Sequence, residues 1–213
     1  MAHLFPIYLD LSGKHCLVIG GGPVAERKVE NLLEYEVNIK LVSPQVEIRI
    51  KQWAQEGTIV WLPREFEELD LEGIFMVFVA TNDGLVNQRA VELCRQRGIL
   101  ANAVDDPPNC DFFIPSIIRH DSLVVAISTE GKSPLFARKL REELEEVITA
   151  EYGEFVDILG DLRIRIKDSV PDIELRRKMF ENLVNSDILN LLKAGENEKA
   201  RERIEECMSS WLA

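Results

Sequence analysis

A glycine-rich turn between an apolar run and a helical pattern constrains the fold of this chain most strongly. Residues 15–19 (His-Cys-Leu-Val-Ile) are apolar and rich in β-branched side chains, which predicts a buried strand. Apolar residues recur at helical spacing after Pro23, and a proline suits the first position of a helix. Between the two lies Gly20-x-Gly22-x-x-Ala25, the pattern of a dinucleotide-binding turn.

Each small residue of this turn has a separate task. Gly20 permits the tight turn, Gly22 lets the backbone approach a pyrophosphate, and Ala25 lets the helix pack closely on the strand. The start of the helix offers free N–H groups and the positive end of its dipole to phosphates. Such a turn can also be only a tight loop, but the strand before it and the helix after it favour nucleotide binding.

The end of the second predicted strand bears on the choice of cofactor. An acidic residue there would bind the ribose hydroxyls of NAD, whereas Ser43 follows residues 38–42 in this chain. A serine can still hydrogen-bond a ribose hydroxyl. Pro44 comes next, and no arginine follows at once to bind a 2′-phosphate. The pattern therefore favours NAD over NADP as the cofactor.

Predicted strands and helices alternate through the first half of the chain. The helix after the turn should end near Glu36, and residues 63–73 form an acidic loop. Helices are predicted over 45–56 and from the end of the turn 81–84 to about Arg97. Strands are predicted over 58–62, 74–80 and 99–104, of which 74–80 is the most apolar. This alternation predicts an α/β fold with right-handed βαβ units and a Rossmann-type parallel sheet.

The pattern changes after residue 112. Residues 112–119 and 123–128 predict a hairpin that turns at His120-Asp121, and Ser133-Pro134 begins a helix. From Tyr152 the chain reads as helical to its end, with breaks at Pro171 and Gly195. Three apolar faces are expected: Phe136, Leu140, Leu144 and Val147; Tyr152, Phe155, Leu159 and Ile166; and Ala200, Ile204, Cys207, Met208 and Trp211.

These changes divide the chain into three predicted domains. Residues 1–113 form an NAD-binding Rossmann domain, 114–150 a dimerisation arm, and 151–213 a helical C-terminal domain. A hairpin and one helix enclose too little volume to form a core alone. We therefore expect the arm to join two copies of the chain in a homodimer with a shared site.

Composition and charge limit the binding partners and the cellular location that we expect for this chain. The net charge of −12 argues against a general nucleic-acid binder or a membrane-surface protein. No apolar run reaches the ~20 residues that span a bilayer, and no secretion signal is visible at the N-terminus, so a cytoplasmic location is expected. The four cysteines form no C-x-x-C pair and the three histidines no ligand pattern, so no metal site is predicted.

A second informative stretch runs from Asn102 to Ser116. Asp105 directly follows a predicted strand, at the edge of a parallel sheet where ligands bind. Alternatively, Asp105 and Asp106 only shape a turn before two prolines, as such sequences often do. The residues alone leave both interpretations open.

Several segments, in order, resemble the precorrin-2 dehydrogenase family. They are residues 20–28 (Gly-Gly-Gly-Pro-Val-Ala-Glu-Arg-Lys), 80–82, Asn87, 102–111, 114–116, 127–129, Ser133-Pro134 and Ala137-Arg138. The resemblance spans about residues 4–150 and continues more loosely through the helical tail. The family comprises NAD-dependent enzymes of sirohaem synthesis, found alone or as the N-terminal part of sirohaem synthase. The chain is too short to hold a methyltransferase domain as well.

The resemblance implies oxidation of precorrin-2, a tetrapyrrole, to sirohydrochlorin. Hydride passes to NAD, and the family's aspartate base corresponds to Asp105, which is also implicated in metal chelation where that occurs. Ser128 corresponds to a residue beside the substrate groove. Glu130 and Lys132 depart from relatives that often carry two glycines in this loop. The corresponding cofactor-binding residues are Gly20, Gly21, Gly22, Pro23, Val24, Ser43, Thr81 and Asn102.

A substrate with many carboxylates needs local cations. These gather around the hairpin and the following helix, and comprise Arg119, His120, Lys132, Arg138 and Arg141. Substrate binding is predicted for Arg119, Lys132 and Arg138, although Glu142 and Glu143 equally fit a solvated helix face.

Two other functions stay open. A bifunctional dehydrogenase and ferrochelatase would also insert iron or cobalt into the product. A non-catalytic Rossmann module that senses NAD and NADH would bind the cofactor without turnover and would not need Asp105.

Overall fold

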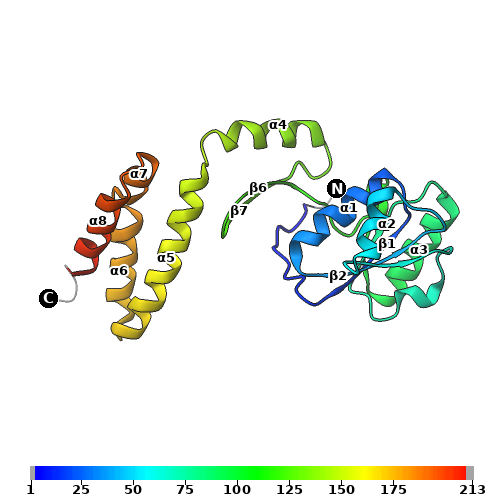
Figure 1. Cartoon of the computed structure of the whole chain (residues 1–213), viewed down its shortest axis with the longest axis horizontal. Coiled ribbons are helices and arrows are strands. Elements are labelled where there is room, and N and C mark those ends of the chain that lie inside the picture. Colours follow the sequence, from blue (N-terminus) through cyan, green and yellow to red (C-terminus); the bar gives the residue numbers. More distant parts are fainter. Residues whose placement is uncertain (1–2, 210–213) are drawn as a thin grey trace. The chain divides into compact units, whose positions relative to one another are not determined.

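A computed structural model describes residues 3–209 of the chain. The structure divides into two compact units, with the boundary between Ile114 and Pro115. Figure 1 shows the elements in chain order. Trp211, one of the residues of the last predicted apolar face, lies outside the described residues.

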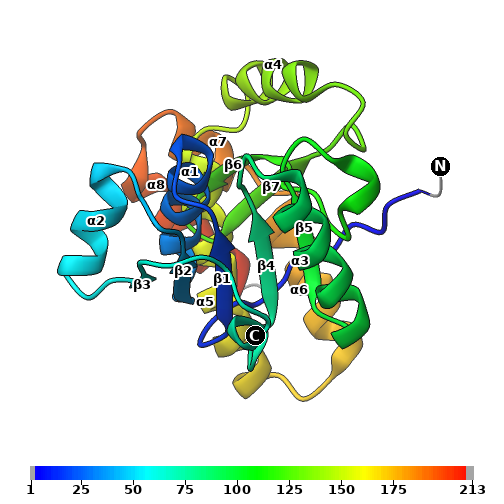
Figure 2. The ribbon, with the colours of Figure 1, turned by 90° about the vertical axis from the view of Figure 1, so that its right-hand side faces the viewer.

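The first unit is built on a five-stranded parallel sheet with strand order β3-β2-β1-β4-β5. This order confirms the predicted Rossmann-type sheet, with β1 at its centre beside β4 (Figure 2). The strands β1 and β2 have the predicted bounds, whereas β3, β4 and β5 are shorter than predicted. The strands are β1 (His15–Ile19), β2 (Asn38–Val42), β3 (Val60–Leu62), β4 (Met76–Val79) and β5 (Leu100–Ala103).

Helices cover both faces of this sheet. Helix α1 (Pro23–Leu32) and helix α2 (Ile48–Gln55) pack over a core that contains Val18 and Phe78. On the opposite face, helix α3 (Gly84–Arg97) packs over Leu17, Val77 and other apolar residues. Every residue of β4 is buried, which agrees with its expected place inside the sheet.

Helix α2 starts later than predicted. The sequence pattern places its start at residue 45, but Val46 lies in the loop before the helix. The reason is a tertiary contact, because the backbone N–H of Glu47 donates to the carbonyl of Gly21 at 2.9 Å. This bond holds the loop after β2 against the glycine turn and delays the helix.

The acidic segment 63–73 contains a short 3-10 helix, Glu68–Leu71, and an ion pair in which the carboxylate of Asp70 is buried. Asp70 is 3% exposed and accepts two hydrogen bonds from Arg64, at 2.8 and 2.6 Å, and one from the N–H of Glu67. Burial acts to raise the pKa of Asp70, but the hydrogen bonds from Arg64 and Glu67 outweigh it and the pKa is lowered. The guanidinium group of Arg64 is therefore held by the carboxylate of Asp70.

The second unit begins with an antiparallel hairpin of β6 (Ser116–His120) and β7 (Leu123–Ile127), followed by helix α4 (Pro134–Glu145). Ser133 caps α4 by accepting a hydrogen bond from the N–H of Phe136 at 3.3 Å. The apolar face predicted for α4 is partly wrong, since Phe136 is 55% and Val147 58% exposed. The residues that pack on the hairpin are instead Ala137, Leu140 and Leu144 of α4, together with Ile148, which follows the helix.

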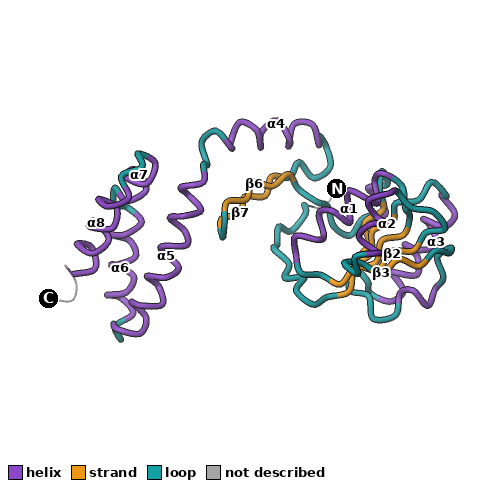
Figure 3. The backbone as a smooth tube through the Cα atoms, in the orientation of Figure 1, coloured by secondary structure: helices purple, strands orange, loops and turns teal. Residues whose placement is uncertain are grey.

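Four helices complete the second unit (Figure 3). They are α5 (Ala150–Ser169), α6 (Ile173–Val184), α7 (Ile188–Lys193) and α8 (Asn197–Ser209). Pro171 lies between α5 and α6, and Gly195, with φ +72°, lies between α7 and α8, so both predicted breaks are confirmed. Their shared core includes Phe155, Ile166 and Met208. No helix within residues 3–209 is both long and apolar enough to cross a membrane.

Two glycines of α5 give a test of how the second unit packs. A Cβ atom at Gly153 would lie 2.4 Å from the carbonyl oxygen of His120, whereas one at Gly160 would meet nothing within 4 Å. We expect Gly153→Ala to lower the free energy of unfolding by about 1–3 kcal/mol, the usual cost of overpacking. The same change at exposed Gly160 should raise it by about 0.5–1 kcal/mol, because alanine favours the helix. Urea unfolding of both variants checks the pair, and effects of equal sign would contradict this packing.

Candidate functional site: a dinucleotide cavity

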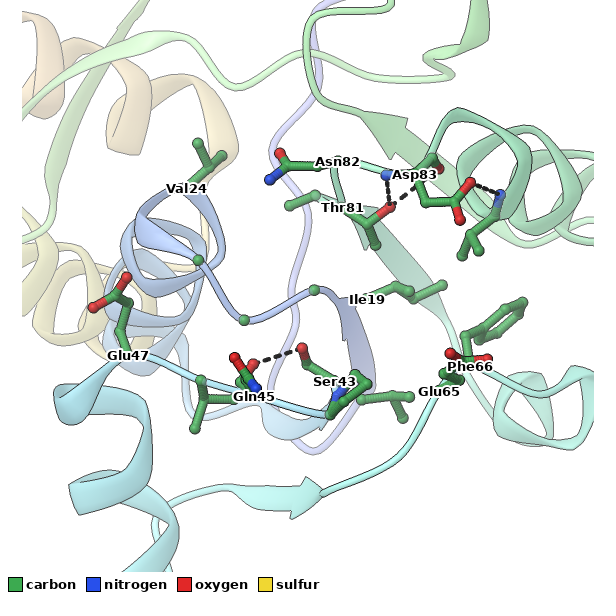
Figure 4. A pocket seen from close by; sticks show the side chains of 18 of the residues that line it. Ile19, Val24, Ser43, Gln45, Glu47, Glu65, Phe66, Thr81, Asn82 and Asp83 are labelled. Carbon is green, nitrogen blue, oxygen red and sulfur yellow. Dashed lines mark hydrogen bonds between the residues drawn. The ribbon is translucent and has the colours of Figure 1, made fainter.

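The loops that follow β1, β2, β3 and β4 meet at the carboxyl edge of the sheet and enclose a cavity of about 530 Å³ (Figure 4). This volume lies within the range of small-molecule and cofactor sites. Seven of the predicted cofactor-binding residues line it, and they are Gly20, Gly21, Gly22, Pro23, Val24, Ser43 and Thr81. The sequence thus predicted residues from three separate loops that the fold brings together.

The three glycines of the turn differ in what surrounds them. A Cβ atom at Gly20, where φ is +119°, would lie 2.3 Å from the carbonyl oxygen of Ala80. A Cβ atom at Gly21 would lie 2.0 Å from the carbonyl oxygen of Gln45. Gly22 has nothing within 4 Å of that position. Packing therefore requires the first two glycines, while the third leaves open space at the start of α1.

The start of α1 fits a pyrophosphate. Gly22 is the N-cap residue and no side chain caps the helix, while Pro23 follows as a first-turn residue without an N–H group. The N–H groups of the first turn are consequently left for an external acceptor, and the helix dipole favours a negative one. The side chains on this cavity include neither lysine nor arginine, all of its lining lying within the described residues.

A polar network fixes the wall formed by the loop after β4. The Thr81 hydroxyl lies 2.5 Å from Asn87 Oδ1, and Asn87 Nδ2 donates to the carbonyl of Thr81 at 3.0 Å. The carboxylate of Asp83 caps α3 by accepting hydrogen bonds from the N–H groups of Leu85 and Val86. Thr81 and Asp83 thus hold this wall of the cavity in place. Contact between Thr81 and a bound cofactor stays a prediction.

Asn102 and Asp105 do not line this cavity. Asn102 is 8% exposed within β5, and its Nδ2 donates to the carbonyl of Phe112 at 2.8 Å. Its side chain therefore holds the loop that returns toward β5. Cofactor binding by Asn102 stays a prediction.

Three aspartates in the loop after β5 have different surroundings. Asp106 accepts a hydrogen bond from Asn109 Nδ2 at 2.7 Å, and Asp111 accepts one from the N–H of Ala101 at 2.9 Å. These two carboxylates shape the loop. Asp105 is exposed, has a left-handed backbone with φ +60°, and within the described part of the chain its carboxylate has no hydrogen bond or ion pair. Unlike its neighbours, the Asp105 side chain therefore has no structural task.

Cys110 lies in the same loop but is a poor nucleophile. Its thiol donates to the carbonyl of Ala103 at 3.1 Å, and burial raises its pKa. A structural role follows from these contacts.

The predicted substrate-binding residues lie in the second unit. Ser128 accepts a hydrogen bond from the N–H of Glu130 at 3.1 Å, and Arg119 is exposed on β6. Lys132 lies 3.8 Å from Glu130, and Arg138 pairs with Glu142 at 2.9 Å, one turn along α4.

The other two expected cations differ in their partners. Arg141 pairs with Glu145 one turn along α4, whereas His120 Nε2, on β6, lies 2.8 Å from the carbonyl oxygen of Ile148, which is distant in sequence. The pairs on α4 match a solvated helix face. The substrate-binding roles of the four residues Arg119, Ser128, Lys132 and Arg138 stay predictions.

Sequence reasoning missed part of the cavity lining. The missed side chains include Gln45, Glu47, Glu65, Phe66, Asn82 and Val86. Their common signal is position, because each lies on or just beyond a loop that follows a strand of the parallel sheet. Within residues 3–209, no group of three or more His, Cys, Asp or Glu side chains could hold a metal ion.

Three segments of the chain match models of known protein families. Residues 7–116 match a family described as putative NAD(P)-binding. Residues 121–146 match the sirohaem biosynthesis protein central family, and residues 151–208 match the sirohaem synthase dimerisation region.

Individual relatives agree with these matches. Siroheme synthase of Thioalkalivibrio sulfidiphilus is 38% identical over 208 residues, which are 98% of this chain and 42% of that protein. Siroheme synthase of Nitrosococcus oceani is 35% identical over 200 residues, covering 94% of this chain and 43% of that protein. The chain thus spans less than half the length of these curated relatives. The solved structure of SirC, a precorrin-2 dehydrogenase, has a TM-score of 0.78 at 26% identity and covers 95% of this chain and 100% of its own.

The fold and the cavity define an NAD(P)-binding protein of the Rossmann class. More narrowly, the three matched segments and the likeness to SirC over 95% of this chain place it in the precorrin-2 dehydrogenase family. The resemblance stated from the sequence motifs is thereby confirmed.

The open space at Gly22 gives a direct test of the cavity. We expect Gly22→Asp to weaken NAD binding by at least about 100-fold, because a carboxylate would stand where the helix N-terminus meets the pyrophosphate. The thermal midpoint should stay within about 3 °C of wild type, since nothing in the fold occupies that space. Calorimetric titration with NAD and a thermal melt measure the two effects.

The same substitution at Gly20 is the matched control. Its side chain would collide with the backbone of Ala80, so Gly20→Asp should lower the thermal midpoint as well as NAD binding. Unchanged NAD affinity in the Gly22 variant would show that dinucleotides bind elsewhere.

Proposed function

We propose that the protein is an NAD-dependent enzyme that oxidises precorrin-2 to sirohydrochlorin in sirohaem biosynthesis. The observation that carries this proposal is a built dinucleotide cavity in a chain that matches SirC over that protein's whole length. A sensor module would need the cavity but not Asp105, which is exposed and whose carboxylate has no partner among residues 3–209.

The reaction removes two hydrogens from the substrate, one as hydride and one as a proton. NAD, when bound, accepts the hydride. The chain's own residues hold the cofactor and receive the proton. The start of α1 holds the pyrophosphate, and the loop after β4 forms the wall of the cavity.

Asp105 is the residue that we assign as the general base. It follows β5 at the same edge of the sheet as the glycine turn follows β1. Its carboxylate has both oxygens available, whereas Asp106 and Asp111 use theirs to shape the loop. A carboxylate so placed can accept a proton as hydride leaves the neighbouring bond.

The second unit supplies the groups that bind the substrate carboxylates in this proposal, and they are Arg119, Ser128, Lys132 and Arg138. The ion pairs of Lys132 with Glu130 and of Arg138 with Glu142 are exposed. Exposed pairs contribute only about 0–1 kcal/mol, so a substrate carboxylate can displace the acidic partner.

The functional assembly that we propose is a cytoplasmic homodimer. The match of residues 151–208 to a sirohaem synthase dimerisation region supports the dimer. The extent of the predicted arm, residues 114–150, stays a prediction. No disulfide joins the four cysteines, all of which lie in the described chain, as suits a reducing compartment.

The assignment of Asp105 is tested by Asp105→Asn. Asparagine tolerates the left-handed backbone at this position as aspartate does, so the loop should keep its shape. Because an amide cannot accept the proton, turnover of precorrin-2 at saturating NAD should fall by about 10²–10⁴-fold, with NAD affinity unchanged. Steady-state rates and a calorimetric titration give both values.

Asp106→Asn serves as the control. This change alters the hydrogen bond to Asn109 and should reduce thermal stability more than the rate constant. Near-normal turnover by the Asp105 variant would show that another group or water takes the proton.

A further inference from the structure

We propose that Glu47 and Glu65 make this site selective for NAD by repelling the 2′-phosphate of NADP. The inference rests on the proposed function and adds the residues that choose the cofactor. Both glutamates line the cavity, one from the loop after β2 and one from the loop after β3. In the view of Figure 4, Ser43 lies between them.

Ser43 occupies the position from which a Rossmann fold usually reads the adenosine ribose. Its hydroxyl donates to the carbonyl of Gln45 at 2.7 Å, which leaves the oxygen lone pairs to accept a bond from a ribose hydroxyl. A serine alone would also tolerate a 2′-phosphate. The discrimination must therefore come from the residues around it.

The loop that carries Glu47 is fixed in position. The N–H of Glu47 donates to the carbonyl of Gly21 at 2.9 Å, and Trp61 Nε1 donates to the carbonyl of Ser43 at 2.9 Å. Gly21 leaves no room for a side chain beneath this loop. The backbone of this loop is therefore held in place, so Glu47 remains on the cavity wall when a dinucleotide binds.

The arginines next to these glutamates are already paired. Arg64, adjacent to Glu65, is held by both carboxylate oxygens of Asp70. Arg49, two residues after Glu47, pairs with Glu30 at 2.7 Å and lies 5.0 Å from the ring of Trp53. Arg64 would have to leave the buried carboxylate of Asp70 to neutralise a phosphate in the cavity, and neither arginine lines the cavity.

The charges in the cavity consequently favour NAD. Among its lining residues, all within the described chain, the acids are Glu47, Glu65 and Asp83, and no lysine or arginine offsets them. The pyrophosphate, common to both cofactors, is served by the start of α1. NADP differs from NAD by a 2′-phosphate, which carries a charge of roughly −1.5 to −2 at pH 7. This phosphate would lie near Ser43.

The test is calorimetric titration of the full chain with NAD and with NADP, for wild type and for the double variant Glu47→Gln, Glu65→Gln. Wild type should bind NAD more tightly. The ratio of the NADP Kd to the NAD Kd should fall at least about tenfold in the variant, because two like charges near the phosphate are removed. In wild type this ratio should also shrink as ionic strength rises from about 0.05 to about 0.5 M, since salt screens the repulsion.

The matched control is Glu56→Gln, Glu72→Gln, which removes the same charge from exposed positions before β3 and β4, at the opposite edge of the sheet. This variant should keep the wild-type ratio. An equal Kd for both cofactors in wild type, or an unchanged ratio in the Glu47, Glu65 variant, would overturn the inference and leave dinucleotide binding standing. A wild type that binds neither cofactor would overturn the proposed function itself.

Discussion

The site depends on one steric constraint, the close approach of the glycine turn to the loops on either side of it. The turn after β1 is flanked by the backbone of Ala80 after β4 and the backbone of Gln45 after β2. Neither contact leaves room for a Cβ atom, so Gly20 and Gly21 determine how tightly the carboxyl edge of the sheet can close. The space left at Gly22 and the uncapped start of α1 then form the anion-binding part of the cavity.

The acidic residues on the loops around the sheet divide into those that hold the fold and those that are available for a ligand. Asp70, Asp83, Asp106 and Asp111 each accept hydrogen bonds that hold a loop or cap a helix. Asp105, Glu47 and Glu65 are exposed, and no such bond holds their carboxylates within the described residues. Because a carboxylate with no structural task is free to meet a ligand, these three residues carry the base and the cofactor selectivity in our account.

Local signals in the sequence were sufficient for much of the fold. The apolar runs predicted β1 and β2 to the residue, and the glycine pattern placed the start of α1 at Pro23. Features that depend on contacts distant in sequence could not be predicted. The start of α2 depends on the hydrogen bond from Glu47 to Gly21, and the buried face of α4 depends on how closely the hairpin approaches Ala137.

The candidate site, like the fold, could be predicted from the sequence only in part. The glycine pattern and the strand ends located seven lining residues, because ligand positions in a parallel sheet follow from topology. Two features of the acidic segment 63–73 could not be predicted from the sequence, because the segment has no periodic pattern. They are the position of Glu65 on the cavity wall and the pairing of Arg64 with Asp70. The partners of Arg138 and Arg141 on α4 were foreseeable from the i, i+4 spacing of acids and bases.

The most direct test of the central claim is the stoichiometry of the reaction catalysed by the wild-type chain. Precorrin-2 and NAD would be mixed with the protein under anaerobic conditions, so that oxygen does not serve as the oxidant. NADH and sirohydrochlorin would then be followed together by absorbance. The account predicts that one NADH forms for each sirohydrochlorin. Tight NAD binding without NADH formation, or sirohydrochlorin formed at the same rate without NAD, would contradict it.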